Sequence, residues 1–181
     1  MKTPAIILTI AFLSHLVPAV AQAPPDYSDL CREQMRKLAY FAGEWEGAAT
    51  MRTGPGPEQT IKQSEYVQYK LDSTVLVIEG TGRDDNNQVV FNALAVVNFN
   101  APTRDYALRS YLKDGRTTAA YFNVVEENKF EWGFDIPGNT GKVRYTIILD
   151  PDAKTWHEVG EFSADGAAWM KFIDMRLRKK G

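Results

Sequence analysis

Gly43-Glu44-Trp45-Glu46-Gly47 marks the point where the sequence changes its period. Before this stretch, apolar residues such as Leu30, Met35 and Leu38 recur at roughly helical spacing. After it, apolar and polar residues alternate in segments rich in Val, Ile, Thr, Tyr, Phe and Trp, with turn residues between them. The stretch is therefore predicted to end a short N-terminal helix and to begin the first strand of an all-β domain.

Short strand-like segments fill the rest of the chain. They are residues 44–52, 59–71, 74–80, 88–98, 105–112, 117–125, 129–136, 142–149, 155–163 and 168–178. Their connections are short and carry turn residues such as Asp114-Gly115, which favours antiparallel neighbours. A long meander hides its edges most simply by closing, so we expect an antiparallel up-and-down β-barrel of about ten strands with one short N-terminal helix. The alternative is a sandwich of two sheets, which needs long return connections.

The N-terminal residues have the form of a secretory signal peptide. Lys2 precedes an apolar run over residues 6–17, and Ala19-Val20-Ala21 gives a cleavage site before Gln22. The run is shorter than the roughly 20 apolar residues that span a bilayer, which argues against a membrane anchor. We expect residues 1–21 to be a signal peptide, 22–43 a leader and helix, and 44–179 the barrel. The protein is then secreted or periplasmic, without a membrane span.

Charge and cysteine content narrow the classes of partner. The formal net charge is −2, and removal of Lys2 with the leader makes it −3. This near-balance is not that of a nucleic-acid-binding surface, which needs a basic patch. Cys31 is the only cysteine, so the exported chain has no internal disulfide. The fold must then be stabilised by packing, and we expect a monomer or a weak dimer.

The opening stretch and the tail together resemble a known family. Residues 43–47 are similar to the opening Gly-x-Trp of lipocalin-like, or calycin-like, barrels. Residues 156–163, Trp169 and residues 175–178 are similar to the end of a bacterial family of secreted lipocalin-like domains of unknown function. The resemblance, which covers residues 35–178, implies a plug at one end of the barrel, with a basic residue of the last strand over its tryptophan. The residues concerned would be Gly43, Trp45, Arg176 and Arg178. It implies no ligand, because one fold hosts many functions.

A barrel of this size predicts an interior lined by aromatic residues and a few polar groups. The candidate ligand-binding residues are Arg109, Tyr111, Tyr121, Trp132, Arg144 and Tyr145. An arginine among them would fix an acidic or polar end of the ligand. Periodicity leaves the inward face open, because both faces of several strands carry aromatic residues, and each charged side chain has a solvent-facing alternative. We assign no catalytic residue, no metal site and no cofactor.

We therefore expect an exported, non-catalytic barrel that binds a small, mostly hydrophobic molecule. Three alternatives remain open. His157, the only histidine beyond the leader, has a late position similar to that of the haem-binding histidine in nitrobindin-like barrels. Glu131 or His157 could instead act as an acid or base in a cavity enzyme. A filled barrel would point to a structural or partner-binding envelope protein.

Overall fold

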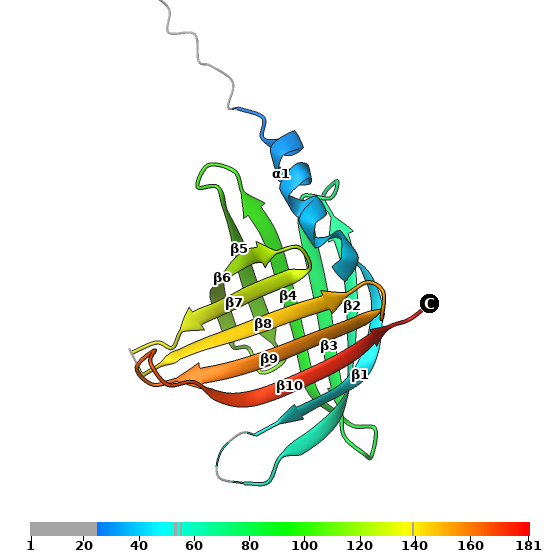
Figure 1. Cartoon of the computed structure of the whole chain (residues 1–181), viewed down its shortest axis with the longest axis vertical. Helices are drawn as coiled ribbons and strands as arrows, with labels where there is room; N and C mark the ends of the chain where they lie inside the picture. Colours follow the sequence, from blue (N-terminus) through cyan, green and yellow to red (C-terminus); the bar gives the residue numbers. More distant parts are fainter. Residues whose placement is uncertain (1–24, 53, 55, 139) are drawn as a thin grey trace, which may run out of the picture.

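The computed structural model describes residues 25–52, 54, 56–138 and 140–181 (Figure 1). The signal peptide expected over residues 1–21 lies outside this part of the chain. The helical segments are α1 (Ser28–Met35) and the 3-10 helix η1 (Arg36–Phe41). The strands are β1 (Gly43–Met51), β2 (Gln59–Lys70), β3 (Val75–Arg83), β4 (Val89–Asn100), β5 (Asp105–Leu112), β6 (Thr117–Glu126), β7 (Lys129–Asp135), β8 (Lys142–Asp150), β9 (Thr155–Ser163) and β10 (Met170–Lys179). Within the described residues, no helix is long and apolar enough to cross a membrane.

The ten strands form one closed antiparallel barrel, as predicted. Each strand pairs with its neighbours in sequence, and β10 pairs with β1 to close the sheet. In Figure 1, β7 to β10 cross steeply in front of β2 to β5, and α1 lies over one end of the barrel. The sandwich alternative is wrong, because short turns let every strand pair with the next one and no sheet edge remains open.

The end of the barrel below α1 is closed by aromatic side chains. Met35, Leu38 and Phe41 of the helical segment are buried against it. Trp45 is 0% exposed, and its Nε1–H donates a hydrogen bond to the Phe41 carbonyl oxygen at 2.7 Å. The Trp45 ring meets the edge of the Trp156 ring at a centroid distance of 5.6 Å. We call this assembly the plug.

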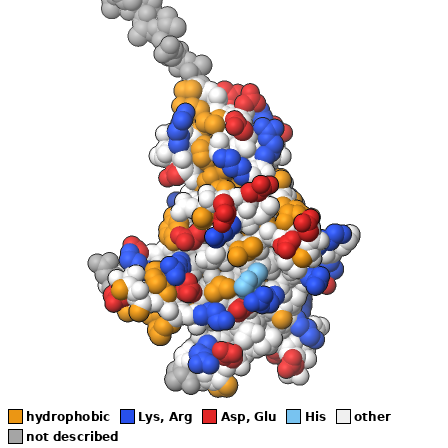
Figure 2. All heavy atoms as spheres, viewed as in Figure 1, with side chains coloured by type: hydrophobic (Ala, Val, Ile, Leu, Met, Phe, Trp, Pro, Cys, Tyr) orange, Lys and Arg blue, Asp and Glu red, His pale blue; other side chains and the backbone are white. Residues whose placement is uncertain are grey.

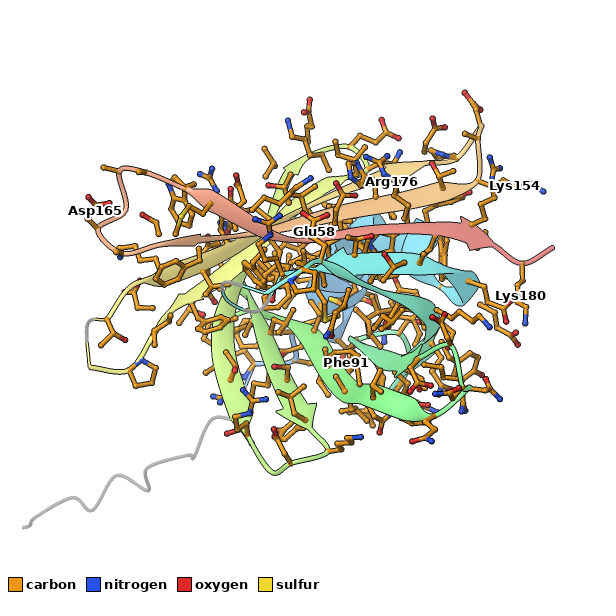
Figure 3. The ribbon with its side chains drawn as sticks, turned by 90° about the horizontal axis from the view of Figure 1, so that it is seen from below. Glu58, Phe91, Lys154, Asp165, Arg176 and Lys180 are labelled. Atoms are coloured by element: carbon orange, nitrogen blue, oxygen red, sulfur yellow. The ribbon has the colours of Figure 1, made fainter. Side chains whose placement is uncertain are left out.

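The cation beside Trp45 is Lys179, not an arginine. Its Nζ lies 5.1 Å from the centre of the Trp45 ring and donates a hydrogen bond to the Tyr40 carbonyl oxygen at 2.9 Å. Lys179 is the register partner of Trp45, and alternation along β10 places Arg176 and Arg178 on the outer face, where both are exposed. Figure 3 shows Arg176 on the outside of the sheet. The expectation that Arg176 or Arg178 covers Trp45 was wrong by one position.

Replacing Lys179 by methionine is expected to lower the free energy of unfolding by about 1–2 kcal/mol, because it removes a hydrogen bond and a cation–π contact. Thermal or urea unfolding measures this change. Arg178→Met is the matched control on the outer face and is expected to change stability by less than about 0.5 kcal/mol. Equal losses in the two variants would show that Lys179 contributes no more to the plug than an exposed residue does.

Candidate functional site

Burial shows which face of each strand points into the barrel. Along β2, Ile61, Gln63, Glu65 and Val67 are buried while the residues between them are more exposed. Along β9, Trp156, Glu158 and Gly160 are buried in the same alternating way. The interior therefore holds two carboxyl groups and one amide. Glu65 is 8% exposed, Glu158 is 9% exposed and Gln63 is 4% exposed.

Two indoles hold the carboxyl group of Glu158. Trp132 Nε1–H donates to Oε1 at 3.0 Å, and Trp156 Nε1–H donates to Oε2 at 3.1 Å. Trp156 also belongs to the plug, so the plug fixes one oxygen of this acid. Burial raises the pKa of Glu158 to about 7, although both hydrogen bonds favour the charged form. Glu158 is thus held in place and takes up a proton near neutral pH.

Glu65 is the less satisfied of the two acids. Gln63 Nε2–H donates to its Oε1 at 2.7 Å, whereas no described group donates to its Oε2. Every fully buried side-chain nitrogen or oxygen among the described residues has a partner, so Oε2 must reach solvent-accessible space. Burial raises the pKa of Glu65 to about 8, and the charge of Glu158 adds to the rise. Both acids thus point into the same interior, from β2 and from β9.

The neighbouring strand β3 leaves room for the Glu65 carboxyl group because it carries glycine at the facing positions. A Cβ at Gly80 would lie 2.9 Å from both oxygens of Glu65. A Cβ at Gly82 would lie 2.9 Å from Oε1 of Gln63. A side chain at Gly80 would displace the Glu65 carboxyl group, and one at Gly82 would displace Ile61 and the Gln63 amide, so the two glycines give the inward side chains of β2 their space.

The half of the barrel away from the plug is less tightly filled. Its inward-facing side chains are mostly half-buried, in contrast to the fully buried residues of the plug half. They include Ile78, Phe91, Ala93, Ala95, Trp132, Phe134, Tyr145, Phe162 and Ile173. The rings of Trp132 and Tyr145 stack with their centroids 3.8 Å apart and an interplanar angle of 2°. The interior thus has two regions. Glu65, Glu158 and Gln63 form a polar region next to the plug, and beyond them lies an apolar half whose side chains are more accessible.

The structure divides the predicted ligand-binding residues between two faces. Trp132 and Tyr145 point inward and lie beside Glu158. Arg109, Tyr111 and Tyr121 lie on the outer face and are exposed. Placing these three in the interior was wrong, because the inward faces of β5 and β6 carry Leu108, Phe122 and their alternating neighbours. Arg144 also lies on the outer face, between the inward-facing Val143 and Tyr145.

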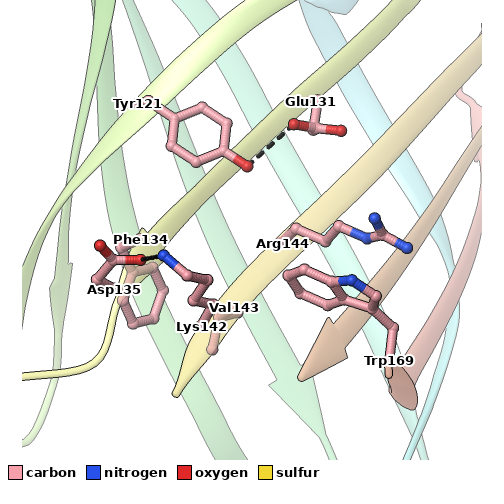
Figure 4. Close-up of a pocket in the computed structure, with 8 residues that line it drawn as sticks. All are labelled: Tyr121, Glu131, Phe134, Asp135, Lys142, Val143, Arg144 and Trp169. Atoms are coloured by element: carbon pink, nitrogen blue, oxygen red, sulfur yellow. Dashed lines mark hydrogen bonds and ion pairs between the residues drawn. The ribbon is translucent and has the colours of Figure 1, made fainter. Parts of the chain in front are cut away.

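Two of these outward residues meet in a surface pocket of about 250 Å³ (Figure 4). The pocket is lined by Tyr121, Glu131, Phe134, Asp135, Lys142, Val143, Arg144 and Trp169. Tyr121 O–H donates to Glu131 at 3.0 Å, and the Arg144 guanidinium lies 4.0 Å from the centre of the Trp169 ring. Arg144 and Lys142 already pair with Glu161 and Asp135, at 2.8 and 2.7 Å. The cations here are neutralised by their neighbours, which leaves no free charge for an anionic ligand.

A second pocket, of about 260 Å³, lies beside α1. It is lined by Leu30, Gln34, Phe99, Arg104 and Tyr106. Tyr106 O–H donates to the Gln34 carbonyl oxygen at 2.8 Å, which ties the helix to β5. Neither Glu65 nor Glu158 lines this pocket.

His157 lies on the outer face of β9, between the inward-facing Trp156 and Glu158. Its Nε2 lies 3.1 Å from Oδ1 of Asp174 on β10. The surface view in Figure 2 shows a histidine side chain among basic groups, with acidic and basic side chains interspersed across this face. The haem alternative and the cavity-enzyme alternative both need His157 or Glu131 inside the barrel, and both residues point outward. In the described ranges, no group of three or more His, Cys, Asp or Glu residues is placed to hold a metal ion.

No protein-family model and no curated protein matches this sequence. Among solved structures, the crystal structure of Rv2717c from M. tuberculosis is similar, with a TM-score of 0.59 and 9% sequence identity over 81% of this chain and 97% of that chain. Lobster apocrustacyanin A1 also matches, with a TM-score of 0.35 and 15% identity over 86% of this chain and 69% of that one. At these identities the similarity concerns the fold alone. The fold is a lipocalin-like, or calycin-like, antiparallel barrel.

Proposed function

We propose that this protein binds a small, mostly apolar molecule in the half of the barrel away from the plug, without converting it chemically. The ligand's polar group would meet Glu65, Glu158 and Gln63. This arrangement replaces the arginines expected from the sequence as the polar anchor. Ligand sites in proteins are generally apolar hollows with a few polar groups that fix orientation.

The observation that carries this proposal is the free oxygen of Glu65. A carboxyl group that is 8% exposed costs stability unless its hydrogen-bonding capacity is used. Its Oε2 has no donor among the described residues, and this oxygen is not fully enclosed by the protein. A ligand that donates a hydrogen bond there would satisfy this oxygen, while its apolar part would lie against the half-buried walls.

Native mass spectrometry of the protein purified from its source is the test. We expect a recurring bound mass, and we expect the polypeptide to begin at Gln22 if the protein is exported as we propose. Ala93→Phe places a ring in the accessible half of the interior and is expected to abolish the bound mass. Ala119→Phe makes the same change on the exposed outer face of β6 and is expected to leave it in place.

Two results would contradict the proposal. One is a bound mass that survives Ala93→Phe unchanged, because the ligand would then lie elsewhere. The other is ligand-free protein from its source that also fails to bind any member of a panel of small apolar molecules. In that case the barrel would be better described as a partner-binding or structural module.

A further inference from the structure

We propose that the polar group of the ligand is a protonated amine, held between Glu65 and Glu158 at the centre of the barrel. This inference rests on the binding function proposed above and specifies its ligand class. It follows from three features of the interior, which are its charge balance, its unused hydrogen-bonding groups and the aromatic surface beside the acids.

The first feature is a charge imbalance. The inward faces of the ten strands carry two acids, Glu65 and Glu158, and one base, Lys179. Lys179 lies at the plug, where it donates to the Tyr40 carbonyl oxygen and faces aromatic rings. Neither acid forms a salt bridge with a described residue. Buried acids are normally paired with a positive charge, and here the protein supplies none.

The second feature is the pattern of unused hydrogen-bonding groups. Glu65 Oε2 and the Tyr145 hydroxyl oxygen both lack a hydrogen-bond partner among the described residues. Tyr145 stacks on Trp132, which donates to Glu158, and the charge of Glu158 contributes to the raised pKa of both Tyr145 and Glu65. An ammonium group has three donors and no acceptor, so it can donate to the lone pairs of the Tyr145 hydroxyl oxygen and to Glu65 Oε2 once that carboxyl group has lost its proton. A carboxylate ligand would be repelled by either acid in its charged form.

The third feature is the aromatic surface beside the acids. Trp132 donates to Glu158 and stacks on Tyr145, and the edge of Phe172 meets the Tyr145 ring at 5.6 Å. Aromatic faces attract cations, and the attraction grows when the site excludes water. Acids and rings together therefore favour an amine over an alcohol of the same shape.

Amine binding should release protons. Burial raises the pKa of Glu65 to about 8 and that of Glu158 to about 7, so both acids hold protons near neutral pH in the free protein. The other ionisable groups on the inward faces are Tyr69, Tyr106, Tyr145 and Lys179. The pKa of each of these tyrosines is raised by burial, so they stay neutral, and the pKa of Lys179 is lowered by burial. An ammonium ion favours the carboxylate forms, so its affinity rises with pH until both acids are ionised.

Isothermal titration calorimetry with matched ligands tests the inference. One series is naphthylmethylamine, naphthalenemethanol and naphthoate, and the other is octylamine, octanol and octanoate. At a pH of about 8 the amine is expected to bind at least about tenfold more tightly than the alcohol, and its affinity should fall on acidification by up to about tenfold per pH unit for each proton released. Titrations in two buffers with different ionisation enthalpies should reveal proton release on binding of the amine alone.

Variants of the two acids test whether these residues bind the amine. Glu65→Gln and Glu158→Gln are expected to lower amine affinity by about tenfold or more while leaving alcohol affinity nearly unchanged. Glu131→Gln, on the outer face of β7, is the control and should bind the amine like the parent protein. Proton release on amine binding is measured with the unaltered protein, so it still tests the inference if a variant fails to fold.

The outcomes separate the two proposals. Equal binding of amine and alcohol without proton release would overturn the amine inference and leave the binding function in place. Preferred binding of the acid would overturn the inference in the same way. No binding by any member of either series would count against both the ligand class and the binding function.

Discussion

Raising the pH from about 5 to about 9 is expected to lower the free energy of unfolding of this protein by several kcal/mol. Glu65 and Glu158 cause the effect. Burial raises their pKa from the ordinary value of 4.5 to about 8 and about 7. Each unit of pKa difference between the folded and unfolded states corresponds to about 1.4 kcal/mol. Two such groups therefore make a large contribution to a typical stability of about 5–15 kcal/mol.

The sign follows from the number of protons bound in each state. Between pH 4.5 and about 8, the unfolded chain has lost the two protons while the folded barrel still holds them or loses them later. The folded state binds more protons, so stability falls as pH rises. Stability is fully retained below the unfolded pKa and is lost as pH rises through the folded values.

Urea unfolding across this pH range measures the effect. The double variant Glu65→Gln, Glu158→Gln is the control and should show a nearly flat profile over the same range. Asp114 and Asp165 do not confuse the result, because hydrogen bonds lower their pKa and they titrate at more acid pH. A parent protein whose stability is constant or rises between pH 5 and 8 would show that the two acids are not buried as described.

The loss of stability that these two buried acids cause has a bearing on function. Replacing buried charged groups by well-packed apolar side chains often stabilises a protein. Apart from Gln63, the core around Glu65 and Glu158 is aromatic and aliphatic. Polar groups that reduce stability are characteristic of binding and catalytic sites, where function opposes stability. The two acids therefore mark the interior site more clearly than any feature of the outer surface.

Local patterns were sufficient to predict the fold. The segments 105–112 and 155–163 coincide with β5 and β9, because turn residues bound them on both sides. Strand β3 continues beyond its predicted end at Gly80 as far as Arg83. Glycine usually weakens a strand, but a Cβ at Gly80 or Gly82 would lie within 3 Å of side chains of β2. The extension thus comes from a tertiary contact that the local pattern does not contain.

The interior site was harder to predict, because it depends on which face of each strand points inward. Arg109 stood out in sequence as a charge among apolar residues, yet its neighbour Leu108 is the buried residue. For β2 the necessary signal was present: Ile61 and Val67 share a face with Glu65, while Lys62 and Ser64 lie on the other. Glu158 shares a face with Trp156 by the same rule. Closure of the barrel then turns both acids toward one interior, which no local pattern reveals.

Replacing Trp45 by alanine is expected to lower the free energy of unfolding by about 3–5 kcal/mol. The ring is 0% exposed, so its removal leaves a cavity between the helical segment and the barrel. The change also leaves the buried Phe41 carbonyl oxygen without the indole donor at 2.7 Å, and removes edge contacts with Tyr40 and Trp156. Trp156 in turn positions Glu158, so a loosened plug should weaken ligand binding as well as stability.

Trp169→Ala is the matched control for this prediction. Trp169 lies on the surface, where its ring contacts the Arg144 guanidinium, and its loss should cost less than about 1 kcal/mol. Trp45→Phe separates packing from hydrogen bonding, because it retains most of the ring volume but removes the donor to Phe41. We expect an intermediate loss of about 1–3 kcal/mol for this variant. If the two alanine variants unfold at the same urea concentration, the Trp45 plug does not hold the helical segment to the barrel. The position of Glu158 must then depend on the strands alone.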